Sequence, residues 1–363
     1  MIIMATQKQV TELARELIKN LPSLTKPRTY LIAYAVLSIV QVCSISLVQI
    51  AMGMATCCKY SSNYRRLQRF IDQIDWPTNE LMRLIVKWAN IDGPFTLLID
   101  RTNWQFGQSK INILCISILC DGYSVPIAWR LLDKKGNSRQ DERIKLLGSI
   151  IDTFGADQID WLVADREFHG EHWLNYLNNN NIKFAIRLCK TRKVKRYGRA
   201  RCVVSTISSN KRNKQHTDGL HYWLDGIQVY IYGFRIRNDK GKLEYLIVAS
   251  QSKNADIISL YAERWYIENM FKDMKSNGLN ITDTHVYNLK RLHCLVGLII
   301  LAQAWIIRIG QYVRKSHPKL FKKAKHRRNR KSVFRGGLDA MKRAFFTNQK
   351  HLIWKYIRFL SCT

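Results

Sequence analysis

The first ninety residues carry apolar side chains at the three- and four-residue spacing that is typical of α-helices. This pattern predicts a helical N-terminal domain over residues 1–90. The predicted helices span residues 7–21, 30–42, 46–57, 62–74 and 79–89.

The period changes to that of β-strands at Phe95. Three apolar runs predict a meander, and the Asp121-Gly122 turn signal separates the second run from the third. A helix and a fourth apolar strand follow, and this strand–helix–strand crossover places the fourth strand beside the first in a mixed sheet. The predicted strands span residues 95–100, 112–119, 125–132 and 159–165, and the helix spans about 139–154. The predicted fold class is therefore α/β.

The second half of the chain adds one more strand of this sheet and then a β-rich stretch that ends near residue 250. The additional strand is predicted at residues 182–188, the hairpin strands at 201–205, 226–235 and 243–250, and two later helices at 261–275 and about 289–314. The predicted boundaries divide the chain into residues 1–90, 91–188, 189–252, 253–316 and a basic C-terminal region, 317–363.

Two predicted strands end in an acidic residue, Asp100 and Asp165. Carboxylates at the ends of adjacent buried strands converge on one edge of the sheet, where open α/β sheets hold ligands. With Glu268 on the later helix, they predict a metal site of three carboxylates. Three acids without clustered His or Cys favour Mg²⁺ or Mn²⁺ over zinc. An acid at a strand end can also serve only as a turn former or helix cap.

The helix predicted over residues 261–275 places four distinctive side chains on one stripe, within an arc of about 60°. These are Tyr261, Arg264, Glu268 and Lys275. One carboxylate flanked by two cations and a phenol suits an acid that holds a metal beside a phosphodiester. The alternative is an amphipathic helix in which Arg264 and Glu268 form an ordinary i,i+4 ion pair.

The charge of the chain points to nucleic acid. Its 59 Lys and Arg exceed its 27 Asp and Glu, which gives a formal net charge of +32. Residues 187–214 hold eleven of these cations and residues 308–335 hold twelve, with no acid in either run. Because an ordinary solvated surface mixes charges of both signs, these runs predict phosphate binding, with double-stranded DNA as the partner.

A DNA-binding segment is predicted in the N-terminal domain, where three arginines alternate with aromatic residues at helical spacing. These are Arg65, Arg66 and Arg69. The alternative is a solvated helix whose Leu67 and Phe70 are buried.

The nine cysteines contain no C-x-x-C pair, so the sequence predicts neither a disulfide framework nor a Cys-based zinc site, and a reducing cytoplasm suits them. Residues 30–58 carry no charge and are long enough to span a bilayer. Because the apolar pattern breaks near Cys43, two buried helices explain this segment better than a membrane span. Residues 292–307 are too short to change this interpretation.

The order of the two aspartates and the glutamate resembles that of the DDE transposases of the retroviral integrase, or RNase H-like, superfamily. The chain is most similar to the IS-four insertion-sequence transposases, whose Tyr-x₂-Arg-x₃-Glu-x₆-Lys signature is matched from Tyr261 to Lys275. Ile99-Asp100-Arg101-Thr102 and Val163-Ala164-Asp165-Arg166-Glu167-Phe168 resemble the segments around the family's aspartates. The 103 residues between Asp165 and Glu268 imply a β-rich insertion before the helix that carries the glutamate.

The resemblance implies a transposase that binds terminal inverted repeats, cleaves DNA at the element ends and joins the 3′-OH ends to target DNA. Two Mg²⁺ or Mn²⁺ ions bound by Asp100, Asp165 and Glu268 would support phosphoryl transfer. Arg264 and Lys275 would hold phosphates, and Tyr261 would bind a phosphate oxygen. An aromatic residue that stacks on a flipped base is expected at Tyr245 or Trp223. The alternative for Tyr245 is a core tyrosine on a β-strand. A homodimeric synaptic complex, associated with the nucleoid in the cytoplasm, is also implied.

Three other functions are compatible with parts of the sequence. One is a metal-dependent RNase H-like nuclease without strand transfer, and another is a catalytically silent, transposase-derived DNA-binding protein. The third is a membrane protein that uses residues 30–58. The basic run over residues 319–335 is expected to be a partly ordered segment that settles on DNA.

Overall fold

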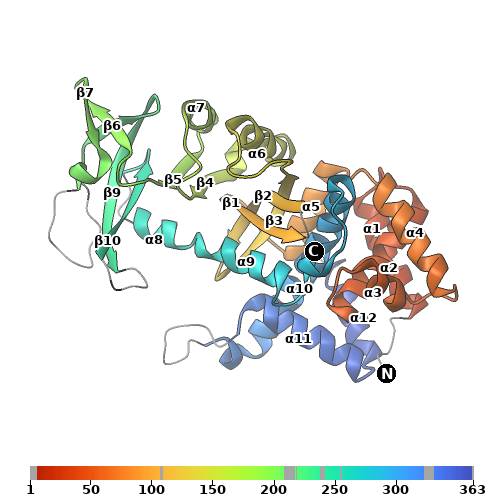
Figure 1. Ribbon diagram of the computed structural model, residues 1–363. Helices are drawn as coiled ribbons and strands as arrows, with labels where there is room; N and C mark the ends of the chain where they lie inside the picture. The colour runs from red at the N-terminus through yellow and green to blue at the C-terminus, as the bar shows by residue number, and fades with distance from the viewer. Residues whose placement is uncertain are drawn as a thin grey trace.

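The protein is built around one mixed sheet of ten strands (Figure 1), with the order β3-β2-β1-β4-β5-β10-β9-β8-β6-β7. The computed structural model describes residues 6–106, 109–207, 217, 219–237, 241, 243–253, 256–322 and 331–361. The predicted α/β class is confirmed, and the sheet with its flanking helices has the architecture of an RNase H-like domain.

The first half of the sheet has the predicted meander and crossover. Its strands are β1 (Phe95–Phe106), β2 (Ser109–Cys120), β3 (Tyr123–Leu131), β4 (Ile159–Ala164) and β5 (Lys183–Arg187). β1 is antiparallel to β2 and parallel to β4, so the fourth predicted strand does lie beside the first. The predicted end of β1 at Asp100 is wrong, because pairing with β2 continues to Phe106 and leaves Asp100 in the middle of the strand.

The β-rich stretch continues the same sheet, because its last strand pairs antiparallel with β5. Its strands are β6 (Lys193–Arg196), β7 (Arg199–Cys202), β8 (His221–Leu224), β9 (Ile227–Arg237) and β10 (Leu243–Ser250). The strand predicted at 243–250 is confirmed, and that at 226–235 corresponds to β9. The strand predicted at 201–205 is wrong, because β7 ends at Cys202 and a 3₁₀ turn, Val203–Thr206, follows.

Helices cover both faces of the sheet (Figure 1). α6 (Gln140–Phe154) and α7 (Glu171–Asn179) lie on one face. α8 (Ile257–Ala262) and α9 (Trp265–Lys275) lie on the other and cross it from β10 towards β3. The Ser124 hydroxyl donates a hydrogen bond of 3.1 Å to the carbonyl of Tyr266, which ties the start of α9 to β3.

A helical layer at one end of the sheet is built from both ends of the chain (Figure 1). It contains α1 (Gln7–Asn20), α2 (Lys26–Val42), α3 (Leu47–Gly53), α4 (Tyr60–Gln73), α5 (Thr78–Ala89), α10 (Leu289–Ser316), α11 (Val333–Phe346) and α12 (Lys350–Arg358). α10 packs on α2, α4, α5 and α11, and α12 packs on α1. The helix predicted over 46–57 ends early, because Met54 adopts an extended backbone after Gly53.

Two parts of this layer pass a test for membrane-spanning length and composition. They are α10 and the bent pair α2–α3, whose axes meet at 101°. The most apolar window of α10 is 89% buried inside the protein, as a core helix is. α10 has 28 residues and is longer than the apolar segment of residues 292–307 that the sequence shows.

The basic C-terminal region is folded from residue 331 to residue 361, with α11 and α12 in the helical layer. α11 buries Phe334, Leu338 and Phe345 against the core, so the end of the run over residues 319–335 is ordered as part of the fold, and its contact with DNA stays a prediction. Residues 323–330, the middle of the predicted basic run, lie outside the described residues.

Candidate active site

Asp100 and Asp165 are brought together by the pairing of two parallel strands. Ile99 on β1 is paired with Ala164, the last residue of β4, so the two aspartates follow on neighbouring strands. The sequence prediction that these two acids meet at one place on the sheet is therefore matched by the strand register.

The signature segment forms two short helices and not one. α8 ends at Ala262 and α9 begins at Trp265, and the chain between them makes tighter i→i−3 hydrogen bonds. The amide of Arg264 donates to the carbonyl of Tyr261 at 3.0 Å, and that of Ile267 donates to Arg264 at 3.1 Å. Because Glu263 and Arg264 keep right-handed helical dihedral angles, Tyr261, Arg264 and Glu268 still lie on one side.

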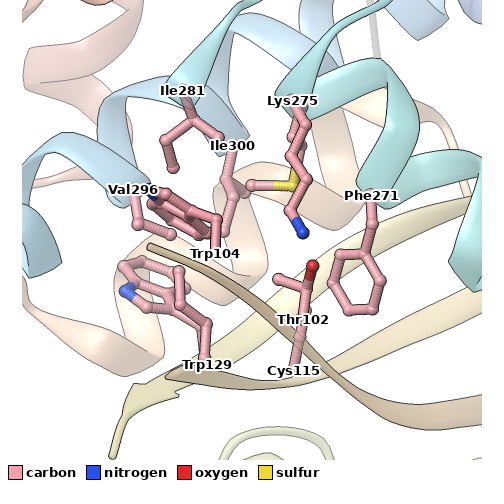
Figure 2. A pocket seen from close by; sticks show the side chains of 11 residues that line it. Thr102, Trp104, Cys115, Trp129, Phe271, Lys275, Ile281, Val296 and Ile300 are labelled. Atoms are coloured by element: carbon pink, nitrogen blue, oxygen red, sulfur yellow. The ribbon is translucent and has the colours of Figure 1, made fainter. Parts of the chain in front are cut away.

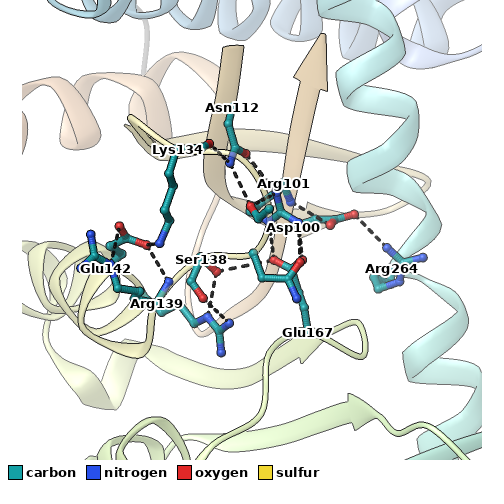
Figure 3. Close-up of polar contacts among 12 residues, drawn as sticks. Asp100, Arg101, Asn112, Lys134, Ser138, Arg139, Glu142, Glu167 and Arg264 are labelled. Atoms are coloured by element: carbon teal, nitrogen blue, oxygen red, sulfur yellow. Dashed lines mark hydrogen bonds and ion pairs between the residues drawn. The ribbon is translucent and has the colours of Figure 1, made fainter. Parts of the chain in front are cut away.

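Arg264 connects the acids of the site, and Figure 3 shows its contact with Asp100. Its Nη1 lies 2.9 Å from Asp100 Oδ2, and its Nη2 lies 2.5 Å from Glu268 Oε1. Its Nε donates to the Tyr261 hydroxyl at 3.2 Å, and this hydroxyl donates to Asp165 Oδ1 at 3.2 Å. One guanidinium thus joins all three predicted acids, two directly and one through Tyr261.

Burial determines the electrostatics of this cluster. Desolvation raises the pKa of Asp100 to about 6, although Arg264 acts in the opposite direction, and the charge of Asp165 adds to the increase. Desolvation also raises the pKa of Tyr261 to about 12, so this phenol is a neutral donor at physiological pH. The charge of Arg264 therefore compensates incompletely for the desolvation of Asp100 and for the negative charge near it.

The arrangement of these acids differs from that of a formed metal cluster. Within the described ranges, no group of three Asp, Glu, His or Cys side chains lies close enough together to hold a metal ion. The guanidinium of Arg264 instead bridges Asp100 and Glu268. The donor chemistry fits Mg²⁺ or Mn²⁺, because three carboxylates converge on Arg264 and desolvation outweighs the positive charge near Asp100.

Two further polar groups near the acids were missed by the sequence analysis as site residues. Arg187, the last residue of β5, has its Nη1 3.8 Å from Asp165 Oδ1. The parallel register of β4 and β5, in which Ala164 pairs with Ile186, places these two residues next to each other. The ends of the two predicted strands were the signal that would have found this pair.

The second missed group is Arg101, which joins β1 to the loop after β4 (Figure 3). Its Nε and Nη2 donate to the carboxylate of Glu167, and its Nη1 donates to Asn112 at 3.1 Å and to the carbonyl of Gly136 at 2.7 Å. Arg101 directly follows Asp100, and Glu167 lies two residues after Asp165. They hold the segments that carry Asp100 and Asp165 together.

Lys275 lies two helical turns beyond Glu268 and contacts β1 past Asp100. Its Nζ donates to the carbonyl of Asn103 at 2.7 Å and lies 5.5 Å from the centre of the Trp104 ring. Figure 2 shows its amine between Thr102 and Phe271. The cavity there is only about 10 Å³, so this is a packed joint between α9 and β1 and not a ligand pocket.

The other predicted DNA-binding residues lie away from the acids. Arg65 and Arg69 are exposed and Arg66 is half-buried on α4, while the same helix buries Leu67 and Phe70 in the core. α4 therefore carries both the exposed arginines and the buried face of Leu67 and Phe70 that the sequence suggested as alternatives. Of the two candidates for base stacking, Tyr245 on β10 is half-buried, and Trp223 on β8 is 49% exposed.

Comparison with known families gives the site its context. Residues 93–305, more than half of the chain, match the family described as Transposase DDE domain. The chain belongs to this transposase family. No curated protein matches the chain.

The region shared with the transposase family runs from the start of β1 into α10 and includes Asp100, Asp165 and Glu268. It also includes the strands from β6 to β10. Membership of a DDE transposase family implies a metal-dependent enzyme that cleaves DNA. α1 to α5 and α11 to α12 lie outside the matched region, although they share a core with α10.

Proposed function

We propose that the protein is an insertion-sequence transposase of the IS-four type, which cleaves DNA at the ends of its element and joins them to target DNA. The observation that carries this proposal is the convergence of Asp100, Asp165 and Glu268 on Arg264. The Tyr261-to-Lys275 signature supports the IS-four assignment.

Asp100, Asp165 and Glu268 are the residues that would hold two divalent ions. When bound, Mg²⁺ or Mn²⁺ activates a water or 3′-OH and stabilises the leaving oxygen of a phosphodiester. Tyr261 donates a hydrogen bond to Asp165 and accepts one from Arg264, so it fixes the orientation of the second aspartate. Arg101 holds the strand of Asp100 against the loop of Glu167.

Arg264 has a second role in this proposal. Two oxygens of a DNA phosphate accept parallel hydrogen bonds from a guanidinium, as the two oxygens of a carboxylate do. When the scissile strand binds, Arg264 exchanges its carboxylate partners for phosphate oxygens, which frees Asp100 and Glu268 for metal. Arg264 and Lys275 then hold phosphates on the two sides of the break.

Recognition of the inverted repeats is assigned to surfaces outside the acid cluster. Arg65 and Arg69 present two cations on the exposed side of α4, and neither has an ion-pair partner in the described part of the chain. The net charge of +32 supports association with DNA and a location with the nucleoid in the cytoplasm. A homodimeric synaptic complex is proposed from the resemblance to the IS-four transposases.

The experiment that tests the proposal is a joining assay with a pre-cut duplex that carries the element's own end and a 3′-OH. We expect Mg²⁺-dependent joining of this end to a supercoiled plasmid. Hydrolysis of the duplex without any joined product would support the RNase H-like nuclease instead. Binding of the duplex with neither reaction would support the silent DNA-binding protein.

A further inference from the structure

The β6–β7 hairpin is a strongly basic ribbon at the open edge of the sheet, far from the acid cluster. Residues 190–201 contain seven Lys or Arg and no acid. β7 is the last strand of the sheet, and all four of its residues are exposed. The hairpin therefore carries exposed cationic residues at an edge of the sheet, where β6 and β7 lie at one end of the molecule (Figure 1).

The strand register distributes these cations over both faces of the ribbon. Lys195 is paired with Ala200 of β7 and with Trp223 of β8, so Lys195 and the half-exposed indole share one face. Arg199 and Arg201 point to the opposite face, because they pair with Arg196 and Val194. Lys195, Arg199 and Arg201 have no ion-pair partner among the described residues. A phosphate partner can therefore be met on either side of the ribbon.

The base of the hairpin is anchored while its cationic strands remain available. Arg192, just before β6, forms an ion pair with the half-buried side chain of Asp225 in the β8–β9 turn. Val194 is fully buried in the core. The ribbon is thus held at a fixed position on the sheet.

The tip of the hairpin is a two-residue turn made by Tyr197 and Gly198, both with positive φ, 48° and 70°. These are the dihedral angles of a type I′ turn, at whose first position Asn is usual and a bulky residue is a genuine outlier. Tyr197 is nevertheless 87% exposed and, among the described residues, is not part of the core or of the side chains packed against it. The guanidinium of Arg196 lies 4.8 Å from the centre of its ring. An unfavourable tyrosine held in solvent at a basic tip is the type of residue that stacks on or wedges against a base.

We propose that this hairpin is a β-ribbon that enters a groove of duplex DNA, with Tyr197 and Arg196 at the base edges and Lys195, Arg199 and Arg201 on the phosphates. A two-stranded ribbon fits the major groove. Pairing of β7 with a second copy of this chain would bring two basic strands together without neutralising acids. Charge complementarity therefore favours DNA as the occupant of this edge.

The position of the hairpin along the sheet sets where it meets the duplex. β6 and β7 are six and seven strand intervals from β1, which carries Asp100. At about 4.8 Å per interval this is about 30–35 Å, which is close to one turn of B-DNA, about 34 Å. We infer that the hairpin contacts the duplex about one helical turn away from the phosphodiester at Asp100. This inference rests on the proposed action on duplex DNA.

The test compares two variants with the full-length wild type. Tyr197→Asn removes the ring but installs the Asn-Gly sequence that a type I′ turn prefers, so the hairpin is expected to fold. Arg199→Ala/Arg201→Ala removes two phosphate contacts, and Lys19→Ala/Lys26→Ala removes the same charge from exposed positions at the end of α1 and the start of α2. Binding to a mixed-sequence duplex of about four helical turns and to one of its single strands is measured over a range of salt.

We expect Arg199→Ala/Arg201→Ala to lower the salt slope of duplex binding by about 2, and the Lys19/Lys26 control to change it by much less. Tyr197→Asn should weaken duplex binding several-fold. Replacement of Tyr197 by p-benzoylphenylalanine should give a cross-link about one turn from the nick on a duplex that carries the element's end.

Equal salt slopes for the hairpin and control variants would overturn the proposal. It would also be overturned if the hairpin variants lost as much affinity for the single strand as for the duplex. Altered sedimentation of the protein alone, with unchanged DNA binding, would assign the edge to a second copy. If the wild type nicks DNA but the hairpin variants bind normally, only the hairpin inference fails. If the wild type does not bind duplex at all, the proposed function fails with it.

Discussion

Arg264 is a largely desolvated cation that serves two carboxylates and a phenol. Only 12% of its side chain is exposed, and it lies within 3.2 Å of groups on β1, α8 and α9. Removing one partner of a buried charged network leaves the others desolvated and unpaired. Arg264 is therefore needed both for the folded site and for the proposed grip on phosphate.

Arg264→Gln is expected to lower the free energy of unfolding at pH 8 by about 2–4 kcal/mol, because Asp100 then remains buried without a cation. Urea denaturation measures this change. Glu268→Gln is the control, since it leaves the Arg264–Asp100 pair in place and should cost about 1 kcal/mol or less. An Arg264→Gln protein as stable as the wild type would show that the guanidinium does not compensate these acids.

A second acid on α9 gives the protein a pH dependence. Desolvation raises the pKa of Asp273 to about 7, with Arg335 acting in the opposite direction. Its carboxylate accepts no hydrogen bond from the residues that the structure describes. Because the folded pKa lies above the unfolded value of about 3.9, the folded state binds the extra proton. The stability from this group is complete below pH 4 and is lost as the pH rises through 7.

Asp273→Asn should remove this loss, so the variant is expected to lose about 2–3 kcal/mol less stability than the wild type between pH 5 and pH 8. Urea denaturation at the two pH values checks this difference. The same replacement at the exposed Asp152 serves as the control. Parallel pH profiles for wild type and Asp273→Asn would contradict the assignment.

At the element scale, the packing of α10 against α11 depends on glycines. A Cβ at Gly337 would lie 1.9 Å from the carbonyl oxygen of Ile306, and one at Gly310 would lie 1.9 Å from that of Val333. The added Cβ would clash with backbone carbonyl oxygens, which cannot rotate away as a side chain can. The two helices therefore approach so closely only because neither glycine has a side chain.

Gly337→Ala is expected to lower the free energy of unfolding by about 2–3 kcal/mol, although alanine favours a helix over glycine, because α11 must move away from α10. Thermal and urea denaturation measure the loss. Gly136→Ala is a contrasting control, since no atom lies within 4 Å of the added Cβ and only its positive φ opposes the change. A neutral or stabilising Gly337→Ala would contradict the close packing.

The sequence predicted the elements whose period is strong and local. β2, β4 and the helices from α4 to α6 have the expected positions within a few residues, because alternation and helical spacing are properties of neighbouring residues. The extension of β1 past Asp100 depends on its pairing with β2. The alternation of neighbouring residues along β1 does not show this pairing. The break between α8 and α9 was not predictable, because Glu263 and Arg264 keep helical dihedral angles.

The candidate site was predicted where chemistry and spacing coincide. Asp100, Asp165 and Glu268 were found from strand ends and the signature, and Tyr261 and Arg264 do connect them. The direct contact of Arg264 with Asp100 was missed, since it joins residues 164 positions apart. Arg187 was missed because it was counted as part of a basic run.

At the scale of the whole molecule, the two ends of the chain share one helical layer. α11 packs on α10 and α2, and α12 packs on α1. The side-chain amide of Gln9 on α1 donates to the carbonyl of Lys350 at 3.4 Å, and the Trp305 indole on α10 donates to the carbonyl of Tyr356 at 2.9 Å. The C-terminal helices are therefore part of the fold that supports the N-terminal helices.

Removal of residues 331–363 is expected to expose the N-terminal helices, because α1 and α10 lose buried partners. Limited proteolysis should then cleave the truncated chain within residues 6–89 much faster than the full chain. Truncation after residue 361 is the control, since α12 ends at Arg358. Equal protection of the N-terminal helices in all three proteins would contradict the shared layer.

The central claim is that Asp100, Asp165 and Glu268 form a metal-dependent centre for DNA cleavage. The most direct test is nicking of a labelled duplex that carries the element's own end, in Mg²⁺ and in EDTA, by wild type and Glu268→Gln at matched DNA binding. Glu263→Gln, five residues earlier on the same segment, is the matched control. We expect nicking by wild type and Glu263→Gln in Mg²⁺ only, and none by Glu268→Gln. Equal nicking by the wild type and Glu268→Gln would contradict the claim.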